Sequence, residues 1–305
     1  MKFGKVHNIE GIKFNLPSNF NGDNECFLKG LNTKGNVKTK IFLGCPVWRD
    51  RSFIGKIYPK LSKVEDYLSL YAENFQSIEL NSTYYALPSN SAILDWCAKV
   101  PKGFKFCPKI PGALANERNL GVEDPLLKDF LTGMELFGEH LGPLLLQLSP
   151  YFDLSRWKAL VKFIRLFPKN MKLAVEFRHH EWFFSKNFKK LVDHMRAFGV
   201  ILVCTDVAGR RDVCHTALTS QQVMIRFTGN GLHKSDFNRS KEWAHLISKW
   251  LDQGLEEAFF FFHQPVEGDC VDVAMDFVKN FKIVSNNKEI RSPALLKETV
   301  QLGLF

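Results

Sequence analysis

The sequence predicts an α/β protein folded as a TIM (β/α)8 barrel. From residue 40 onward, short apolar segments rich in β-favouring residues alternate with segments of helical periodicity, which is the pattern of βα units around a parallel sheet. Eight such units within roughly 250 residues have the size and order of a TIM barrel. An open doubly wound sheet would usually begin with a GxGxxG turn, and the first turn, at 44–48, lacks that motif.

The first 40 residues differ from the rest of the chain. Asn and Gly cluster at 19–24 and no hydrophobic period is sustained, so we expect 1–40 to form an irregular arm whose apolar residues lie against the barrel exterior. The remaining residues, 41–305, are then expected to form a single TIM-barrel domain.

The expected strands are all short. In chain order they are 41–47, 77–83, 104–109, 144–148, 173–178, 200–206, 223–227 and 258–263. A capping-box spacing of Ser62 and Glu65 predicts the start of the first helix. The helical spacing of apolar residues predicts further helices at about 89–99, 125–140, 155–167, 185–198, 240–253 and 271–280. Residues 207–222 are irregular and rich in Gly and Arg, so we expect the sixth helix to be reduced to a loop or a short turn.

The composition is that of an ordinary globular protein, with 45% hydrophobic and 24% charged residues among 305. The 41 Lys and Arg exceed the 32 Asp and Glu by nine, which favours anionic partners and leaves both phosphorylated small molecules and nucleic acid open. No run of about 18 apolar residues occurs and no apolar signal segment follows Met1, so we expect no membrane partner. Seven cysteines without a CxxC pair predict neither a disulfide framework nor a zinc knuckle and favour a cytoplasmic protein. The oligomeric state is left open.

One expected strand, 173–178, carries charges on a face that should be interior. Alternation places Ala174, Glu176 and Arg178 on the same side of that strand. A buried unpaired charge costs several kcal/mol, so such residues persist where they pair, bind a ligand or lie at a wet strand end. This face is therefore either the floor of a functional site or a Glu–Arg pair that only sets strand register.

The carboxyl ends of TIM-barrel strands supply the catalytic groups, and in this chain those ends are consistently polar. The side chains expected there are Glu79, Asn81, Lys109, Gln147, Glu176, Arg178, Asp206, Arg226 and His263. Three carboxylates facing three cations would shift one another's pKa values, which is how such sites obtain a general acid and a general base. A structural ion pair remains the alternative for each residue taken singly.

We therefore expect the following roles. The candidate catalytic residues are Glu79, Glu176 and Asp206, with Glu176 or Glu79 as general base. The candidate substrate-binding residues are the anion clamps Lys109, Arg178 and Arg226, the polar residues Asn81, Gln147 and His263, and the aromatic residues Trp48, Tyr85 and Trp182. The aromatic residues fall just beyond strand ends, where they either wall a pocket or cap the core.

Metal and thiol chemistry have weaker signals. Asp206, Glu176, His179 and His263 could supply ligands to a divalent cation, but no HExxH or similar spacing occurs, so we expect no metal and no other cofactor. Cys45, Cys107 and Cys204 also lie on expected strands. We interpret them as small buried hydrophobic residues, with an activated thiol as the alternative.

The chain resembles domain-of-unknown-function family 72, the YecE-like TIM barrels, over about residues 40–280. The motifs that carry the resemblance are Gly44 with Trp48, YP at 58–59, SIELNSTYYALP at 77–88, Trp96, the stretch 101–109, LG at 141–142, LQL at 146–148, and VEFRH at 175–179 with Trp182. The resemblance implies a barrel with a polar pocket at its carboxyl face and implies no settled reaction.

Three positions depart from the pattern of that family. Residues 112–116 read GALAN where a Thr-His pair is usual, Thr228 with Gly229 replaces His-Gly, and His263 with Gln264 replaces a pair of Asn residues. The residues that match the family are Glu79, Asn81, Glu176, Arg178, Asp206 and Arg226.

These observations favour an enzyme that acts on an anionic substrate, phosphate-bearing or sugar-containing, by general acid/base chemistry. The reaction would be that of an isomerase or lyase, or of a hydrolase. One alternative is a nucleic-acid phosphodiesterase or repair-type nuclease, which the positive charge allows and the poor supply of metal ligands disfavours. A second is a non-catalytic protein that uses the same pocket to hold a ligand or a partner.

Overall fold

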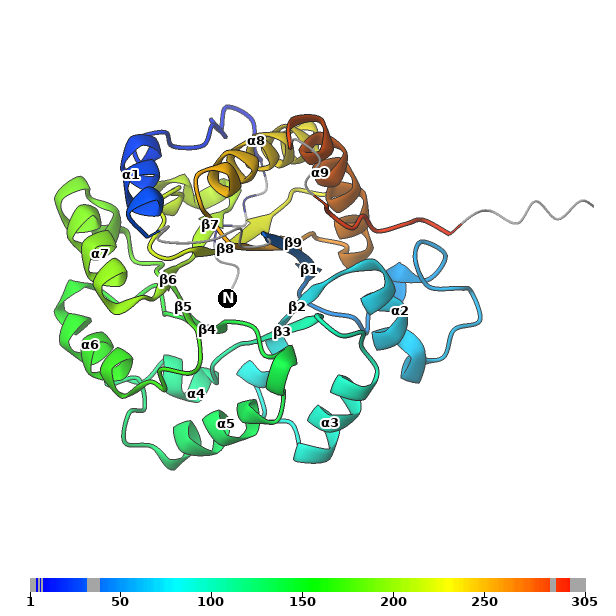
Figure 1. Ribbon diagram of the computed structural model, residues 1–305, viewed down its shortest axis with the longest axis horizontal. Coiled ribbons are helices and arrows are strands. Elements are labelled where there is room, and N and C mark those ends of the chain that lie inside the picture. Colours follow the sequence, from blue (N-terminus) through cyan, green and yellow to red (C-terminus); the bar gives the residue numbers. More distant parts are fainter. Residues whose placement is uncertain (1–3, 5, 7, 32–38, 286–288, 297–305) are drawn as a thin grey trace, which may run out of the picture.

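The strands form a ring that the helices surround, as expected for a TIM barrel (Figure 1). The computed structural model of the protein describes residues 4, 6, 8–31, 39–285 and 289–296. Parts of the expected arm (1–3, 5, 7 and 32–38) and of the expected barrel domain (286–288 and 297–305) lie outside the described residues. The strands are β1 (Lys40–Cys45), β2 (Ser77–Leu80), β3 (Lys105–Pro108), β4 (Leu144–Gln147), β5 (Leu173–Glu176), β6 (Ile201–Leu202), β7 (Cys204–Asp206), β8 (Gln222–Thr228) and β9 (Glu257–His263).

The ring closes through parallel pairings. One run of strands has the order β3-β2-β1-β9-β8-β7 and a second has the order β4-β5-β6. The first junction joins β3 to β4, where the Ile110 amide donates to the Leu145 carbonyl at 2.9 Å. At the second junction, β6 and β7 are two halves of one barrel strand, and the Val203 amide between them donates to the Val175 carbonyl at 3.0 Å. The expectation of eight parallel barrel strands is confirmed.

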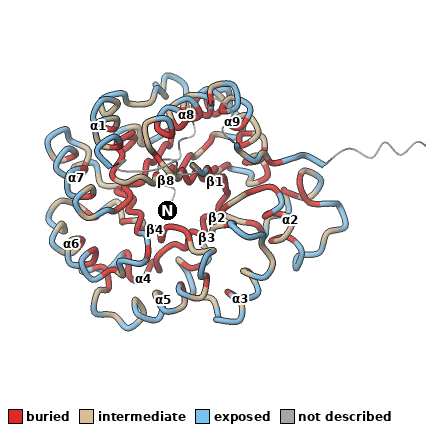
Figure 2. The backbone as a smooth tube through the Cα atoms, viewed as in Figure 1, coloured by how far each residue is buried: buried red, intermediate tan, exposed pale blue. Residues whose placement is uncertain are grey.

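The helices lie outside the ring, and their inner faces are buried against it (Figure 2). They are α1 (Asn21–Leu31), α2 (Tyr67–Asn74), α3 (Asn90–Ala98), α4 (Gly112–Ala115), α5 (Pro125–Glu135), α6 (Trp157–Leu166), α7 (Ser185–Phe198), α8 (Lys234–Asp252) and α9 (Cys270–Val284). A short 3-10 segment, Ala208–Val213, takes the place of the sixth helix, as expected. None of the helices in the described part of the chain is both long and apolar enough to cross a membrane.

Two expectations about element ends are wrong. Ser62 does not cap the first helix, because a 3-10 turn, Val64–Asp66, precedes α2 and Asp66 holds the N-cap position. Strand β2 ends at Leu80 rather than at residue 83, and the chain then turns into a 3-10 segment, Asn81–Tyr84. The Thr83 hydroxyl stabilises that turn by donating to the carbonyls of Leu80 and Lys109 at 2.8 and 2.7 Å.

The arm is more ordered than its sequence indicated. It contains α1, which the missing hydrophobic period had hidden. The helix is held by tertiary contacts, because the buried Asn24 side chain donates to the Thr216 carbonyl at 2.7 Å and accepts from the Leu218 amide at 2.8 Å. Leu28 is buried against the barrel exterior, where the apolar residues of the arm were expected.

The barrel interior is apolar through its middle and polar only at the carboxyl ends. Its apolar side chains are Phe42, Cys107, Leu145, Ala174, Ile201, Val203, Met224, Phe259 and Phe261. Phe42 and Phe259 stack with ring centroids 4.6 Å apart. Gly44 has no room for a side chain, since a Cβ there would lie 2.3 Å from the Ser77 carbonyl oxygen and 3.0 Å from the Phe261 ring. This close packing fills the middle layer of the barrel.

Candidate functional site

A cavity of about 650 Å³ lies at the carboxyl ends of the barrel strands. Its lining includes the expected residues Tyr85, Lys109, Gln147, Arg178, Arg226 and His263, together with Tyr84, Asn116, Ser149, Thr205, Thr228, Asn230, His233, Gln264 and Glu267. Gly4, Val6 and Ile9 of the arm also line it, so this part of the arm lies at the barrel mouth and not on the exterior as expected. The Gly209 amide, which donates to the Gly4 carbonyl at 2.9 Å, helps to hold it there.

Arg226 on β8 joins two carboxylates from opposite parts of the ring. Its Nε and Nη2 donate to Oε2 and Oε1 of Glu79 at 2.8 and 2.9 Å, and its Nη1 donates to both carboxylate oxygens of Glu176 at 2.9 Å. Glu79 is on β2 and Glu176 on β5, and neither strand neighbours β8. Because every nitrogen of the guanidinium donates to these carboxylates, its contacts indicate a bridge across the barrel rather than the expected anion clamp.

Glu176 accepts hydrogen bonds from three further side chains. The donors are Gln147 Nε2 at 2.6 Å, Thr205 Oγ1 at 2.9 Å and Arg178 Nη2 at 3.3 Å. The Glu176 carboxylate has no exposed surface. Its hydrogen-bonding capacity is filled by donors from β4, β7 and β8 and by Arg178, which lies two residues beyond β5. Such a set of partners is typical of a buried structural carboxylate.

Glu79 is equally buried and has a second partner in His263, whose Nε2 lies 3.1 Å from Glu79 Oε2. Burial alone would raise the pKa of Glu79, but the charges of Arg226 and His263 and their hydrogen bonds hold that pKa well below the usual value. Burial would also raise the pKa of Glu176. The charges of Arg178 and Arg226 outweigh this effect and lower that pKa to about 2. Both carboxylates are therefore ionised at neutral pH and are poor proton acceptors.

Lys109 is the cation of this group that no carboxylate neutralises. It directly follows β3, is 8% exposed, and its Nζ lies 4.3 Å from the centroid of the Tyr84 ring. Among the residues that the structure describes, none forms a hydrogen bond or an ion pair with that Nζ. Burial and the neighbouring Arg226 lower the pKa of Lys109 to about 8, although Glu79 and Glu176 act in the opposite direction.

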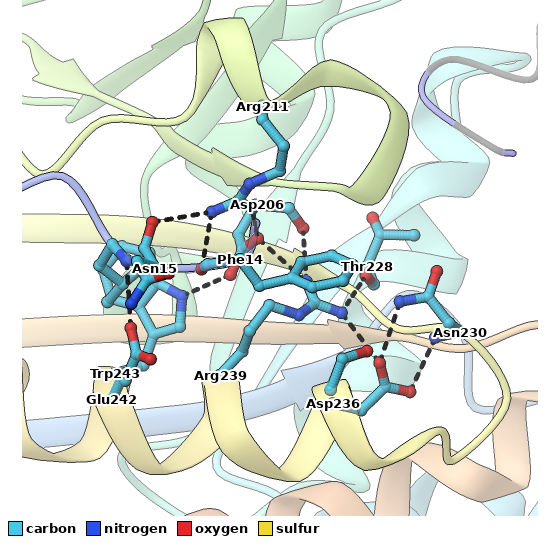
Figure 3. Close-up of polar contacts among 12 residues, drawn as sticks. Phe14, Asn15, Asp206, Arg211, Thr228, Asn230, Asp236, Arg239, Glu242 and Trp243 are labelled. Atoms are coloured by element: carbon cyan, nitrogen blue, oxygen red, sulfur yellow. Dashed lines mark hydrogen bonds and ion pairs between the residues drawn. The ribbon is translucent and has the colours of Figure 1, made fainter. Parts of the chain in front are cut away.

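Asp206 does not face the cavity, so its expected place among the site carboxylates is wrong. It accepts from Arg239 Nη1 at 2.9 Å and from Trp243 Nε1 at 2.8 Å, both on α8, and it pairs with Arg211 (Figure 3). The alternation along β7 is the reason, because the preceding Thr205 points inward to Glu176 and Asp206 must then point outward. The Arg211 guanidinium also donates to the Phe14 carbonyl at 3.0 Å and thereby ties the arm to this cluster.

Besides Asp206 and the fully buried Glu79 and Glu176, three more expected site residues lie outside the cavity lining. Asn81 is in the turn that follows the shortened β2, so strand alternation does not direct it inward. Trp48 packs edge-on against Trp96 of α3, with ring centroids 5.4 Å apart. Trp182 is buried in the outer layer, where its Nε1 donates to the Phe152 carbonyl at 2.6 Å. These two indoles cap the core, whereas Tyr85 lies at the rim and is 84% exposed.

Several cavity residues were not anticipated from the sequence. Thr205 would have been found by alternation from Ile201 and Val203, which face the barrel interior. His233 lies beyond the end of a strand in a segment without periodicity, so no sequence pattern marks it. It becomes a cavity residue only when the fold brings its loop to the barrel mouth.

Two of the three departures from the family pattern, at 228–229 and 263–264, pack against each other in the structure. Gln264 Oε1 accepts from the Gly231 amide at 3.1 Å, and its Nε2 donates to Asp236 Oδ2 at 3.3 Å. A Cβ at Gly229 would lie 2.0 Å from the Gln264 amide nitrogen, so the glycine and the glutamine fit one another. His263, which stands where the family pattern has Asn, contacts Glu79 through its imidazole.

Metal and thiol sites are not supported by the donor groups of the described residues. In that part of the chain no three His, Cys, Asp or Glu side chains gather in a group that could hold a metal ion. The nuclease hypothesis therefore lacks the donor set of a metal-dependent phosphodiesterase. Burial raises the pKa of Cys45, Cys107 and Cys204, and this favours inert thiols.

A larger hollow, of about 840 Å³, lies near the amino ends of β1 and β3. It is lined by Lys40, Lys102 and Arg291 among others. In TIM barrels this face contributes to stability, and reacting groups come from the opposite end. We therefore place the candidate site in the cavity at the carboxyl ends.

Comparison with known proteins shows the family. The family model described as "Protein of unknown function DUF72" matches residues 42–296. The chain is 26% identical over 248 residues to the UPF0759 protein YecE of Escherichia coli strain K12, an alignment that covers 74% of this chain and 86% of that protein. It is 23% identical over 254 residues to the UPF0759 protein YunF of Bacillus subtilis, with 79% and 89% covered.

Solved structures show the same fold. A DUF72 family protein from Enterococcus faecalis aligns with a TM-score of 0.66 at 20% identity and covers 81% of this chain and 99% of that one. A DUF72 family protein from Thermotoga maritima aligns with a TM-score of 0.61 at 22% identity, with 79% and 99% covered. At these identities the likeness shows the fold alone.

Proposed function

The chain belongs to the DUF72 family of proteins of unknown function, and from that premise we propose that its cavity binds a small anionic substrate on which the protein acts as an enzyme. The observation that carries this proposal is the charge of the lining. Its basic side chains are Lys109, Arg178, Arg226, His233 and His263, and its acidic one is Glu267. A concave site with such an excess of basic groups attracts anions.

The positions of the charged side chains support the same proposal, because the carboxylates are buried and the cations line the cavity. Glu79 and Glu176 have no exposed surface, and their two charges are balanced by those of Arg226 and Arg178, with which they pair. Lys109 and Arg178 reach the cavity, and the Lys109 ammonium has no carboxylate partner among the described residues. A phosphate or carboxylate group would supply the missing counter-charge.

The size and remaining lining fit a small polar molecule. A volume of about 650 Å³ falls within the usual range of roughly 300 to 1,000 Å³ for small-molecule sites. Gln147, Asn116 and Asn230 add hydrogen-bonding groups, and Tyr84 and Tyr85 form an aromatic wall. This combination suits a sugar phosphate or a similar hydroxylated anion.

Proton transfer would fall to other groups than those expected from the sequence. The low pKa and full burial of Glu79 and Glu176 disfavour them as general bases. Lys109, whose pKa is lowered to about 8, lines the cavity, and so does the imidazole of His263. We therefore assign acid/base chemistry to Lys109 and His263.

Calorimetric titration with phosphate and with sugar phosphates tests the proposal. Loss of one charge-assisted contact in Lys109→Met should weaken binding by about 10- to 100-fold. Lys102→Met, which removes an exposed lysine from the hollow at the opposite end of the barrel, serves as the matched control and should bind like the wild type. Equal affinity of wild type and Lys109→Met would contradict the proposal. A steep fall of affinity for oligonucleotides with salt would instead indicate nucleic-acid binding.

A further inference from the structure

We propose that Lys109 forms a covalent imine with the carbonyl carbon of the substrate, so that the substrate class is an anionic aldehyde or ketone such as a carbonyl-bearing phosphate ester or a 2-oxo acid. This inference rests on the proposed function, because the anionic group of the ligand would hold it in the cavity. It adds a covalent reaction at Lys109 to that function.

The backbone of Lys109 is held firmly while its side chain projects into the cavity. Its amide donates to Thr83 Oγ1 at 3.0 Å and to the Leu80 carbonyl at 3.2 Å, and its carbonyl accepts from the Thr83 hydroxyl at 2.7 Å. The Tyr84 ring lies against Nζ at 4.3 Å from its centroid. A nucleophile that directly follows a rigid strand and has a wall on one side attacks a carbonyl on its cavity side, which favours a reproducible reacting geometry.

The amine has no competing partner within the described residues. Arg226 occupies both nearby carboxylates, Glu79 and Glu176, through four hydrogen bonds. An amine that a carboxylate held would stay protonated and would not add to a carbonyl. With a pKa of about 8, about a tenth of Lys109 is the neutral, nucleophilic amine at neutral pH.

Two other lysines among the described residues lack this environment. Lys56 is paired with Asp269 and Asp272 at 3.0 and 2.7 Å. Lys105, the first residue of β3, donates from Nζ to the Glu139 carbonyl at 2.6 Å. Lys105 is therefore a matched comparison for Lys109, because the two lysines lie at opposite ends of the same strand, one as its first residue and one directly after its last.

The reaction balances without any oxidant or reductant. The Lys109 nitrogen lone pair forms the C–N bond as the carbonyl π bond breaks, and the proton lost by nitrogen passes to the oxygen. A proton from a cavity side chain then allows the carbinolamine hydroxyl to leave as water. The positively charged iminium that remains keeps the second N–H and withdraws electrons from the neighbouring carbon. His263 and the Tyr84 hydroxyl line the same cavity and can donate or accept these protons.

Borohydride trapping tests the inference with two probe pairs. The carbonyl probes are dihydroxyacetone phosphate and pyruvate, and their alcohol counterparts, glycerol 3-phosphate and lactate, cannot form an imine. The protein is incubated with each carbonyl probe, reduced with borohydride, digested and mapped by mass spectrometry. We expect a reduced adduct on the peptide that contains Lys109, its loss in Lys109→Arg and its persistence in Lys105→Arg. An excess of the matched alcohol should suppress it at least tenfold.

The outcomes separate the two proposals. Calorimetric binding of glycerol 3-phosphate or lactate without any adduct on Lys109 would overturn the imine and leave anion binding intact. Binding of none of the four probes, together with no adduct, would overturn the proposed function and the imine with it. Adducts spread equally over exposed lysines, and unchanged in Lys109→Arg, would also overturn the imine.

Discussion

Arg226 and Glu79 form a two-point ion pair, with Nε to Oε2 at 2.8 Å and Nη2 to Oε1 at 2.9 Å, inside a barrel where Glu79 has no exposed surface. The same guanidinium binds Glu176 through Nη1. One cation thus bridges two carboxylates from strands on different sides of the ring. The three residues that the sequence suggested as base and clamp act together as a cross-barrel bridge, and the cavity above them keeps the charge of Lys109.

Arg226→Met is expected to destabilise the protein by about 3 to 5 kcal/mol, because it leaves two buried carboxylates without their main cation. The deficit should shrink on mild acidification. In the variant, the pKa values of Glu79 and Glu176 rise, so proton uptake by the folded state restores stability as the pH falls. In the wild type the pKa of Glu176 is about 2. The stability that this carboxylate contributes is therefore present above the pKa it has in the unfolded chain and is lost as the pH falls from that value towards about 2.

Urea unfolding of wild type and Arg226→Met at neutral pH and at about pH 5 measures this difference. Arg51→Met, which removes an exposed arginine far from the bridge in the sequence, is the control and should change little at either pH. A deficit that stays constant between the two pH values would contradict the assignment of the loss to unpaired carboxylates.

Glu176→Gln is expected to cost on the order of 3 kcal/mol while the protein still folds. The amide keeps one acceptor oxygen, but its NH2 group then faces donors from Gln147, Thr205 and Arg226. Thermal melting against Glu65→Gln, an exposed carboxylate on the surface, gives the comparison. An unchanged melt combined with lost turnover of an identified substrate would instead support Glu176 as a general base.

Asp206→Asn is expected to loosen the arm and to leave phosphate binding intact. Asp206 pairs with Arg211, whose guanidinium donates to the Phe14 carbonyl. Asp206 itself is not among the residues that line the cavity. Limited proteolysis should therefore cut within 8–20 several times faster than in the wild type. Asp212→Asn, which removes the partially exposed partner of Arg210 in the same 3-10 segment, is the matched control. A loss of phosphate affinity in Asp206→Asn would contradict the placement of this residue outside the site.

The strand pattern predicted the barrel and much of the site, because alternation along a strand is a local property. Glu79, Lys109, Glu176 and Arg226 follow that rule and meet at one end of the ring. The prediction for Asp206 is wrong because alternation from Ile201 and Val203, which face the interior, places Thr205 inward and Asp206 outward.

The remaining errors depend on contacts between distant segments, and a local pattern cannot contain them. Trp48 lies outside the cavity because it packs against Trp96 of α3. Trp182 lies outside it because its indole N–H donates to the Phe152 carbonyl. The arm at the barrel mouth is held by contacts such as that between Gly4 and Gly209, which are 205 residues apart in sequence by their numbers. Such pairings are visible only once the fold is known.

Lys109→Met is expected to stabilise the protein at neutral pH. The charged and titratable side chains that act on Lys109 are Tyr84, Glu79, Glu176, Arg178 and Arg226. Their balance and burial lower its pKa from an ordinary 10.5 to about 8, so the folded protein binds this proton less tightly than the unfolded chain does. Below about pH 8 the buried ammonium therefore destabilises the protein by on the order of 3 kcal/mol, and methionine removes that penalty while it keeps most of the side-chain volume.

The sign of the pH dependence makes this stabilisation distinctive. Between about pH 8 and 10.5 the unfolded chain binds more protons than the folded one, so wild-type stability at Lys109 recovers as the pH rises. The advantage of Lys109→Met in urea unfolding should thus be largest at neutral pH and vanish near pH 10.5, while Lys60→Met, at an exposed lysine, shows no such trend. A variant no more stable than the wild type at neutral pH would mean that water solvates the Lys109 ammonium in the cavity. The amine would then keep its ordinary basicity and too little of it would be neutral to attack a carbonyl.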